Sequence, residues 1–217
     1  MTDTPTVAVR GTVSRQVEPE LAQLSITVAA RDKDRQATLA RLAQRVEALK
    51  VVLDRYADQI DSRETSGLYV HPEVKGSREK VTAYAGSVTT TVTFKDFSQL
   101  GDAVLTLADQ DQVTVTGPYW SLRPDSPAFK EARRAAIDDA LDRAHEYAQA
   151  LGARVLSMVD LADAGTSGEP APIQPLGFAM RSATAMDQPQ LDLEPQRQTV
   201  YAAVDARFRI SAPDVER

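Results

Sequence analysis

Hydrophobic and polar residues alternate near the N-terminus of the chain, and this alternation predicts β-strands. Val7, Val9 and Val13 share one face of a first run, and a second alternating run extends from Ala22 to Ala30. A period of two residues is typical of a strand with one dry face. Because only a short turn around Pro19 separates the two runs, we expect them to pair as a hairpin.

The same alternation returns near the C-terminus, from Val200 to Ile210. It predicts a final strand, either central in its sheet or paired with the strand that follows the second long helix. We expect Phe208 to be buried in this strand. A charged residue at that position would then unfold the protein, because an unpaired buried carboxylate costs several kcal/mol.

A helical period replaces the alternation after the charged cluster at residues 31–35. Apolar residues recur three and four positions apart, which predicts one long amphipathic helix that lies on a sheet. The residues of this stripe are Leu39, Leu42, Val46, Leu49, Leu53 and Tyr56.

Alanines define a second long helix. Ser126 is expected to cap its first turn, Pro127 fits its first position, and Gly152 supplies a left-handed stop. Small residues at every fourth position let the helix approach its neighbour closely, so Ala140→Leu should cost about 1–3 kcal/mol by overpacking. The alanines of this row are Ala132, Ala136, Ala140, Ala144 and Ala148.

The middle of the chain predicts further strands and one shorter helix. The stretch from residue 60 to residue 84 mixes strand residues with breakers, and residues 75–78 form the expected tip of a hairpin. A β-branched run, residues 88–94, predicts the next strand. Ser98 is a candidate cap for the shorter helix. Strands are also expected over residues 113–122, where Gly117-Pro118 indicates a bulge or an edge position, and over residues 155–161.

These elements together predict an α+β fold of mostly antiparallel sheets, packed against two long helices and one shorter helix. The expected order is β-β-α-β-β-α-β-α-β-β. Residues 1–163 together with residues 198–217 are expected to form one α+β domain, either undivided or built of two intimate subdomains. Residues 164–197 are rich in proline and glycine and are interpreted as a loop or a disordered insertion.

Composition narrows the classes of partner. A content of 42% hydrophobic residues supports an ample core, and a net charge of −6 with a pI near 5.0 provides no basic field for nucleic acid. Cysteine is absent, so disulfides and thiolate chemistry are excluded. No window approaches the ~20 apolar residues of a membrane span. The chain as written lacks a signal peptide, which predicts a cytoplasmic location; a leader-trimmed chain would instead be periplasmic or extracytoplasmic.

Candidate catalytic residues are few, and no enzyme is predicted. The two histidines, His71 and His145, fall in separate elements. Asp138, Asp139 and Asp142 are interpreted as a solvated helix face, because Asp139 turns away from the other two. No nucleophile elbow, phosphate-binding loop or dinucleotide fingerprint occurs. We therefore expect no catalytic residue, no bound cofactor and no metal.

Four residues are candidates for contact with a partner. Tyr69 and His71 lie in the expected hairpin of residues 69–84, where His71 precedes a proline. Tyr119 and Trp120 follow Gly117-Pro118 and would anchor a partner if their strand is an edge. Packing of the Tyr119/Trp120 pair in the core is the favoured alternative.

Several local patterns, in their order along the chain, resemble the SIMPL-domain family (DUF541). This family includes bacterial oxidative-stress defence proteins and periplasmic immunogenic antigens. The matching stretches are residues 9–13 with Pro19-Glu20, Thr65 with Tyr69 and Pro72, residues 81–85, and the alanine helix from Ala132 to Gly152.

The resemblance implies a compact α+β unit and homo-oligomeric, ring-like or channel-like assembly in at least some members. It implies no defined reaction and transfers no catalytic residue. The chain departs from the family by lacking an export signal and by having a long loop before its last strand.

The leading hypothesis is therefore a non-enzymatic, self-assembling protein with a structural or stress-related role. The alternative is a module that binds a ligand or a protein partner. It would use the 69–84 hairpin, the Tyr119/Trp120 region or the proline-rich loop.

Overall fold

The computed structural model describes residues 5–75, 80–164 and 191–214. It contains antiparallel sheets and helices in the predicted order, so the α+β class is confirmed. The helices have 20, 9 and 24 residues. The elements are β1 (Thr6–Val17), β2 (Leu21–Asp32), α1 (Arg35–Asp54), β3 (Ile60–Lys75), β4 (Lys80–Phe94), α2 (Leu100–Ala108), β5 (Val113–Ser121), α3 (Pro127–Ala150), β6 (Val155–Asp163) and β7 (Gln198–Ile210).

The chain divides into two compact units. Unit 1 comprises residues 1–17, 124–182 and 197–217, and unit 2 comprises residues 18–123 and 183–196. The predicted insertion at residues 164–197 lies mostly outside the described residues, which resume at Leu191. Residues 191–197 form neither helix nor strand. Leu193 packs against the core of unit 2.

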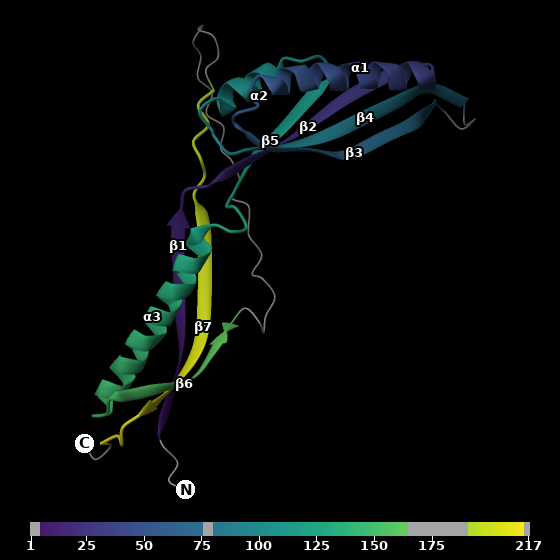
Figure 1. Cartoon of the computed structure of the whole chain (residues 1–217). Coiled ribbons are helices and arrows are strands. Elements are labelled where there is room, and N and C mark those ends of the chain that lie inside the picture. The colour runs from purple at the N-terminus through teal and green to yellow at the C-terminus, as the bar shows by residue number, and fades with distance from the viewer. Residues whose placement is uncertain (1–4, 76–79, 165–190, 215–217) are drawn as a thin grey trace, which may run out of the picture. The chain divides into compact units, whose positions relative to one another are not determined.

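Unit 1 is a three-stranded antiparallel sheet, in the order β1-β7-β6, with α3 lying along one face (Figure 1). The final strand β7 is central and also pairs with β6, the strand after the alanine helix, so both forms of that prediction hold. Val7 pairs with Phe208 and Val9 with Ala206, and these side chains face α3. Phe208 is 2% exposed, which confirms its predicted burial.

The alanine row brings α3 unusually close to the sheet of unit 1. All five predicted alanines are buried. A Cβ added at Gly11 of β1 would lie 1.9 Å from the carbonyl oxygen of Ala136. The predicted boundaries of this helix are confirmed: the Ser126 hydroxyl accepts a hydrogen bond from the Ala128 amide, and Gly152 has a φ of +69°.

Unit 2 is a four-stranded antiparallel sheet in the order β3-β4-β2-β5, and Figure 1 shows both of its helices on one face. Helix α1 packs on β2 and β4, and α2 packs on β5. Leu24, Ile26 and Val28 of β2 are fully buried beneath these helices. From α1, the core receives Leu42, Leu49, Leu53 and, just beyond the helix, Tyr56.

The predicted hairpin between the first two strands is wrong. Strand β1 pairs with β7 in unit 1, and β2 pairs with β4 and β5 in unit 2. Both strands have one apolar face, and that pattern fixes which side is buried without fixing the partner. The short segment around Pro19 therefore joins two units instead of turning a hairpin.

The predicted cap at Ser98 is also wrong. Helix α2 begins at Leu100, and Gln99 precedes it without a side-chain cap. The backbone amide of Ser98 instead donates to a carboxylate oxygen of Asp96 at 2.9 Å. This local turn occupies Ser98 one residue too early for capping.

The strand-breaking residues between positions 60 and 84 do not end the strands. The structure instead has register shifts within two continuous strands. Strands β3 and β4 form a long hairpin whose register shifts at three places, including the step from Thr65 to Gly67. Its expected tip, residues 75–78, falls mostly outside the described residues. Strand β5 is an edge strand, and the register of β2 against it shifts between Gln23 and Ser25, opposite Gly117-Pro118. The predicted edge position and bulge are thus confirmed.

Candidate functional site

Tyr69 and His71 lie on the outer strand of unit 2, on the face of the sheet opposite the helices. Tyr69 pairs with Ser87 of β4, and His71 pairs with Ala85. Both side chains are exposed, Tyr69 at 68%. An exposed tyrosine on an edge strand offers an apolar ring and a polar tip to a partner.

The predicted aromatic pair on β5 separates into two roles. Tyr119 pairs with Gln23, is 55% exposed and lies on the same helix-free face as Tyr69 and His71. Trp120 faces the helices, where its ring meets Phe97 edge-on with centroids 4.9 Å apart. Three of the four candidates therefore share one face at opposite edges of the sheet, and Trp120 packs against the core.

Hydroxyl groups cover the sheet between these aromatic side chains. Thr27 and Thr89 share a hydrogen bond of 3.0 Å, and Thr91 donates to Ser66 at 3.3 Å. No helix of unit 2 lies over this surface among the described residues. We name it the hydroxyl face. Its central members are Ser25, Thr27, Ser87, Thr89, Thr91, Thr93, Thr114 and Thr116.

An ion pair lies at one end of the hydroxyl face. The Arg31 guanidinium donates two hydrogen bonds, at 2.8 and 2.7 Å, to one carboxylate oxygen of Glu73. These bonds hold the pKa of Glu73 below its ordinary value and raise the pKa of Arg31. The pair joins the first unit-2 strand, β2, to β3 across β4. The Glu73 carboxylate at this end of the hydroxyl face is therefore already bound by Arg31.

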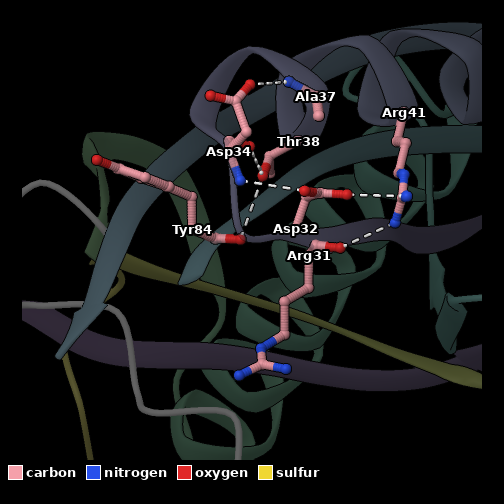
Figure 2. Close-up of polar contacts among 7 residues, drawn as sticks. All are labelled: Arg31, Asp32, Asp34, Ala37, Thr38, Arg41 and Tyr84. Carbon is pink, nitrogen blue, oxygen red and sulfur yellow. Dashed lines mark hydrogen bonds and ion pairs between the residues drawn. The ribbon is translucent and has the colours of Figure 1, made fainter. Parts of the chain in front are cut away.

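Figure 2 shows the polar contacts that begin α1 at the same end of the sheet. Asp34 accepts a hydrogen bond from the Ala37 amide at 2.9 Å, and Thr38 donates to the carbonyl of Asp34 at 2.9 Å. Thr38 is fully buried and also donates to the carbonyl of Tyr84 at 3.3 Å. These contacts fasten the first turn of α1 to β4, which is a structural role.

Asp32 joins this network through Arg41, whose guanidinium lies 2.8 Å from its carboxylate (Figure 2). A hydrogen bond from the Asp34 amide is the main cause that lowers the pKa of Asp32, and Arg41 lowers that pKa further. The carboxylate is therefore charged and engaged at neutral pH. It is poorly suited to accept a proton from a substrate.

Strand β6 is the most apolar uncovered strand of unit 1. It is an edge strand, and α3 packs on β1 and β7 with little contact to β6. Exposed fractions along it range from 42% to 53% for four large apolar side chains. We name these residues the β6 patch. They are Leu156, Met158, Val159 and Leu161.

Charged side chains gather beside β6 on the face of unit 1 opposite α3. Arg10 donates to both carboxylate oxygens of Asp205, at 2.8 and 2.9 Å. This bond pair raises the pKa of Arg10 and lowers that of Asp205. Asp160 and Arg207 complete the rim of a hollow of about 310 Å³. Because the Arg10–Asp205 pair is half exposed, its contribution to stability is small.

The acidic group on α3 is divided between solvent and the sheet. Asp138 and Asp142 are exposed, and Asp139 accepts a hydrogen bond from the Thr12 amide at 2.8 Å. Arg143 lies 3.0 Å from the same carboxylate oxygen. The exposed His145 lies on the same helix. Within residues 5–75, 80–164 and 191–214, no three histidine or acidic side chains gather in a way that would hold a metal ion.

The sequence interpretation missed the hydroxyl face and the Arg10–Asp205 pair. The alternation of Thr89, Thr91 and Thr93 with apolar residues carried a signal for the hydroxyl face. That alternation identifies a strand, but only the pairing of β2, β4 and β5 shows that their hydroxyls adjoin. Arg10 and Asp205 are 195 residues apart in sequence, and no local pattern links them.

None of the helices in the described part of the chain has the length and apolar content that a membrane crossing requires. Among curated proteins, none matches the chain. A family model named SIMPL, described as proteins of unknown function (DUF541), matches residues 7–208. This match extends from β1 into β7 and includes strands of both units. The chain therefore belongs to the SIMPL family.

Proposed function

We propose that this SIMPL-family chain is a non-enzymatic module that associates with copies of itself through the β6 patch. The observation that supports this proposal is the exposure of Leu156, Met158, Val159 and Leu161 on one edge strand. Contiguous exposed apolar side chains on a soluble surface mark interaction sites. A partner copy that covers them would remove apolar area from water.

Burial of the β6 patch contributes free energy to association. Each side chain of the patch is about half exposed, and burying the remainder gives roughly 1 kcal/mol per side chain. Helix α3 covers the neighbouring strands β1 and β7 and makes only a small contact with β6. The helix layer over this sheet is therefore incomplete, and a second copy supplies the missing cover.

Two features of β6 keep the association specific. Its register against β7 shifts twice, between Val155 and Ser157 and between Met158 and Asp160. Such irregularities hinder open-ended pairing of an edge strand. Asp160 and Asp163 add like charges that oppose unspecific stacking. Side-chain packing against the patch is thus favoured over indefinite extension of the sheet.

The test is the native mass of the full chain, measured by light scattering coupled to size exclusion. Val159→Lys places a charge in the patch at an exposed position between two register pairs, so folding is retained. We expect the unsubstituted chain to be a discrete multimer and the variant to be at least twofold smaller. Val51→Lys, at a 62% exposed position on α1, is the matched control and should keep the multimer.

A monodisperse monomer of the unsubstituted chain at high concentration would reject this proposal. An unchanged mass for Val159→Lys would reject the β6 patch as the contact. Circular dichroism of both variants verifies that the comparison is between folded proteins.

A stress-related role accompanies this proposal, because the family resemblance noted in the sequence implies one. The physiological test is survival of a deletion strain under oxidant challenge, with complementation by the unsubstituted chain and by Val159→Lys. Loss of survival without the protein, restored only by the chain that self-associates, would connect assembly with the stress role. Equal survival in all strains would remove the stress role.

A second candidate function is binding of a ligand or protein partner on the hydroxyl face of unit 2. The observation that favours it is the position of Tyr69, His71 and Tyr119 on this one face. Hydrogen exchange in the presence of fractionated cell lysate should then protect β3 and β5. Tyr69→Ala should abolish that protection, and Tyr147→Ala, at an exposed position on α3, should leave it intact.

A further inference from the structure

A hollow of about 300 Å³ lies in unit 2 on the helix side of the sheet, where α1 adjoins β3 and β4. Helix α1 packs on β2 and β4, and the outer strand β3 lies at the edge of the sheet beside it (Figure 1). The helix layer therefore ends over the β3-β4 pair, and the hollow lies at that boundary. Its volume is at the lower limit of small-molecule sites, so it admits a molecule about the size of one large side chain.

The floor of the hollow is apolar. Leu49 and Leu53 of α1 line it and belong to the core of unit 2, where they are 3% and 1% exposed. Val46, which precedes Leu49 by one turn, also lines the hollow and is half-buried. These side chains form no hydrogen bonds, so a molecule that covers them must be mainly apolar where it touches them.

Two hydroxyl groups lie beside this apolar floor. Thr65 of β3 and Thr90 of β4 are paired across the strands, and both line the hollow. Val92, two residues beyond Thr90, is fully buried in the core, so the Thr90 side chain points to the same, helix-covered face. Neither hydroxyl has a hydrogen-bond partner within residues 5–75, 80–164 and 191–214. The pair can therefore donate a hydrogen bond to a bound molecule or accept one from it.

The charged groups at the rim of the hollow are engaged with each other. Lys50 donates to Glu47 at 2.6 Å, and Arg63 donates to Asp54 at 2.6 Å. The Glu64 carboxylate lies on the opposite, hydroxyl face, because successive residues of a strand alternate between faces. An uncharged molecule is therefore the best match to this rim.

The walls of the hollow are held in place by Arg63. Besides its bond to Asp54, the Arg63 guanidinium donates to the carbonyl oxygen of Leu53 at 2.6 Å. This bond ties the last turn of α1 to β3, so the hollow exists before any molecule binds. The register of β3 against β4 shifts between Thr65 and Gly67, directly beside the hollow. Such irregularities often lie next to functional sites, where they redirect side chains.

We propose that this hollow binds a small, uncharged and mainly apolar molecule that carries one hydroxyl or ring N–H group. Its apolar part covers Val46 and Leu49, and its polar group forms a hydrogen bond with the Thr65–Thr90 pair. A charged molecule would lose its hydration without gaining an unpaired partner. A molecule without a polar group would displace water from the two hydroxyls and replace none of its hydrogen bonds.

This site is independent of the proposed self-association. The hollow is built from residues of unit 2, whereas the β6 patch belongs to unit 1. Binding in the hollow needs one copy of the chain, so it is measured at the level of the single chain. The native mass, measured without any added molecule, tests self-association separately.

Indole is a suitable first molecule, because it is small, uncharged and carries a single ring N–H. Indole is titrated into the full chain, and amide NMR spectra follow each step. We expect saturable shifts concentrated in residues 46–54 of α1, 63–67 of β3 and 88–92 of β4. Indene has nearly the same shape but no N–H, and it should bind about fivefold more weakly, as the loss of one hydrogen bond predicts.

Substitution of the two threonines tests the hydroxyl pair. Thr65→Val combined with Thr90→Val removes both hydroxyls and keeps the shape of the side chains. This variant should bind indole and indene equally. Thr93→Val, on the hydroxyl face of β4, is the matched control and should keep the fivefold preference. A purely structural role of the threonines would not change the ratio of the two affinities.

Val46→Phe tests the location, because the larger side chain fills the hollow. It should abolish the binding of both molecules. Val51→Phe, at a 62% exposed position on α1, is the matched control and should bind them as the unsubstituted chain does. Circular dichroism verifies that all variants are folded.

The absence of saturable indole binding by the folded, unsubstituted chain would overturn this proposal. Equal affinity of that chain for indole and indene would reject recognition by the hydroxyl pair. Binding that persists in folded Val46→Phe would reject the hollow as the site. None of these results changes the native mass, so the proposed self-association stands or fails on its own test.

Discussion

In each unit a long helix packs on a sheet, but the side chains between helix and sheet differ in size. In unit 1, α3 meets its sheet through five alanines, each exposed by 1% or less, and Gly11 lies beneath them. In unit 2, α1 meets its sheet through Leu42, Leu49 and Leu53. A leucine buries far more apolar area than an alanine, so unit 2 gains stability mainly from side-chain burial. Unit 1 depends instead on the short distance between backbones.

This difference teaches which changes each unit tolerates. A close backbone contact leaves no room for an added atom, because the surrounding interior is already tightly packed. A leucine interface is more sensitive to removal of atoms, which leaves a cavity. Enlarging substitutions should therefore damage unit 1 selectively. Hydrogen exchange resolved by peptide can report each unit separately in the full chain.

The largest expected effect is that of Phe208→Asp. Phe208 is 2% exposed in the core of unit 1, so the substitution buries an unpaired carboxylate. We expect a loss of about 4 kcal/mol or more, which unfolds unit 1. Peptides from β1, β7 and α3 should lose their protection, and peptides from β2 and β4 should retain it. Tyr201→Asp, at a 65% exposed position on the same strand, is the control. Equal loss of protection in both units would contradict the separation into units.

Gly11→Ala should follow in severity. The added Cβ would lie 1.9 Å from the carbonyl oxygen of Ala136 and 2.6 Å from the amide nitrogen of Ala140. Both neighbours are backbone atoms, so α3 must move away, at an expected cost of about 3 kcal/mol. Thermal unfolding measures this loss. Gly67→Ala meets only the far end of the Tyr69 ring, at 3.2 Å, and should be much milder. Comparable losses in the two variants would argue against a close approach of α3.

Ala140→Leu should cost about 1–3 kcal/mol, because a longer side chain can be partly accommodated by rotation. Ala140 is fully buried, and Ala150 near the end of the same helix is exposed. Ala150→Leu is therefore the matched control and should leave stability nearly unchanged. Urea unfolding of both variants gives the difference. A neutral Ala140→Leu would show that α3 lies less tightly on its sheet than described.

The smallest effect concerns acid stability. The hydrogen bond from the Thr12 amide is the main cause that lowers the pKa of Asp139, with a further contribution from Arg143. A depressed pKa in the folded state means that the stabilisation is complete at neutral pH. It is lost as pH falls through the ordinary value of 3.8 towards the lower folded value. Asp139→Asn should therefore flatten the decline in stability of unit 1 below about pH 4.

Asp138→Asn is the neighbouring control for this experiment, because Asp138 is exposed. Unfolding midpoints are measured between neutral pH and the acid limit for both variants. If Asp139→Asn keeps the same decline as the unsubstituted chain, the Thr12 contact contributes nothing to acid stability.

The sequence predicted the elements well because each has a local signal. The row of alanines, Ser126 and Gly152 together marked α3, and the β-branched run of β4 marked a strand. Which strands pair with each other was harder to predict from the sequence. Val7 pairs with Phe208 across almost the whole chain, whereas the neighbouring runs β1 and β2 never pair. Alternation records which face is dry and carries no information on the partner.

The candidate contact residues show the same limit. Tyr119 and Trp120 are adjacent, so strand geometry requires that they face opposite sides, but the sequence could not decide which side is buried. The structure assigns the core side to Trp120 through Phe97. Tyr69 and Tyr119 lie on opposite edge strands, and only the order β3-β4-β2-β5 shows that they share a face.

The pairing of β1 with β7 also determines which unit can fold first while the chain is being translated. Every helix and strand of unit 2 lies between residues 21 and 108 or in β5, which ends at Ser121. These elements have all left the ribosome before β7 is translated, so unit 2 can complete its hydrogen bonds first. Strand β1 is made before the elements of unit 2, and its partner β7 is made after them. Strand β1 therefore has no partner strand until β7 is translated, and a nascent chain stopped before Gln198 carries β1 unpaired.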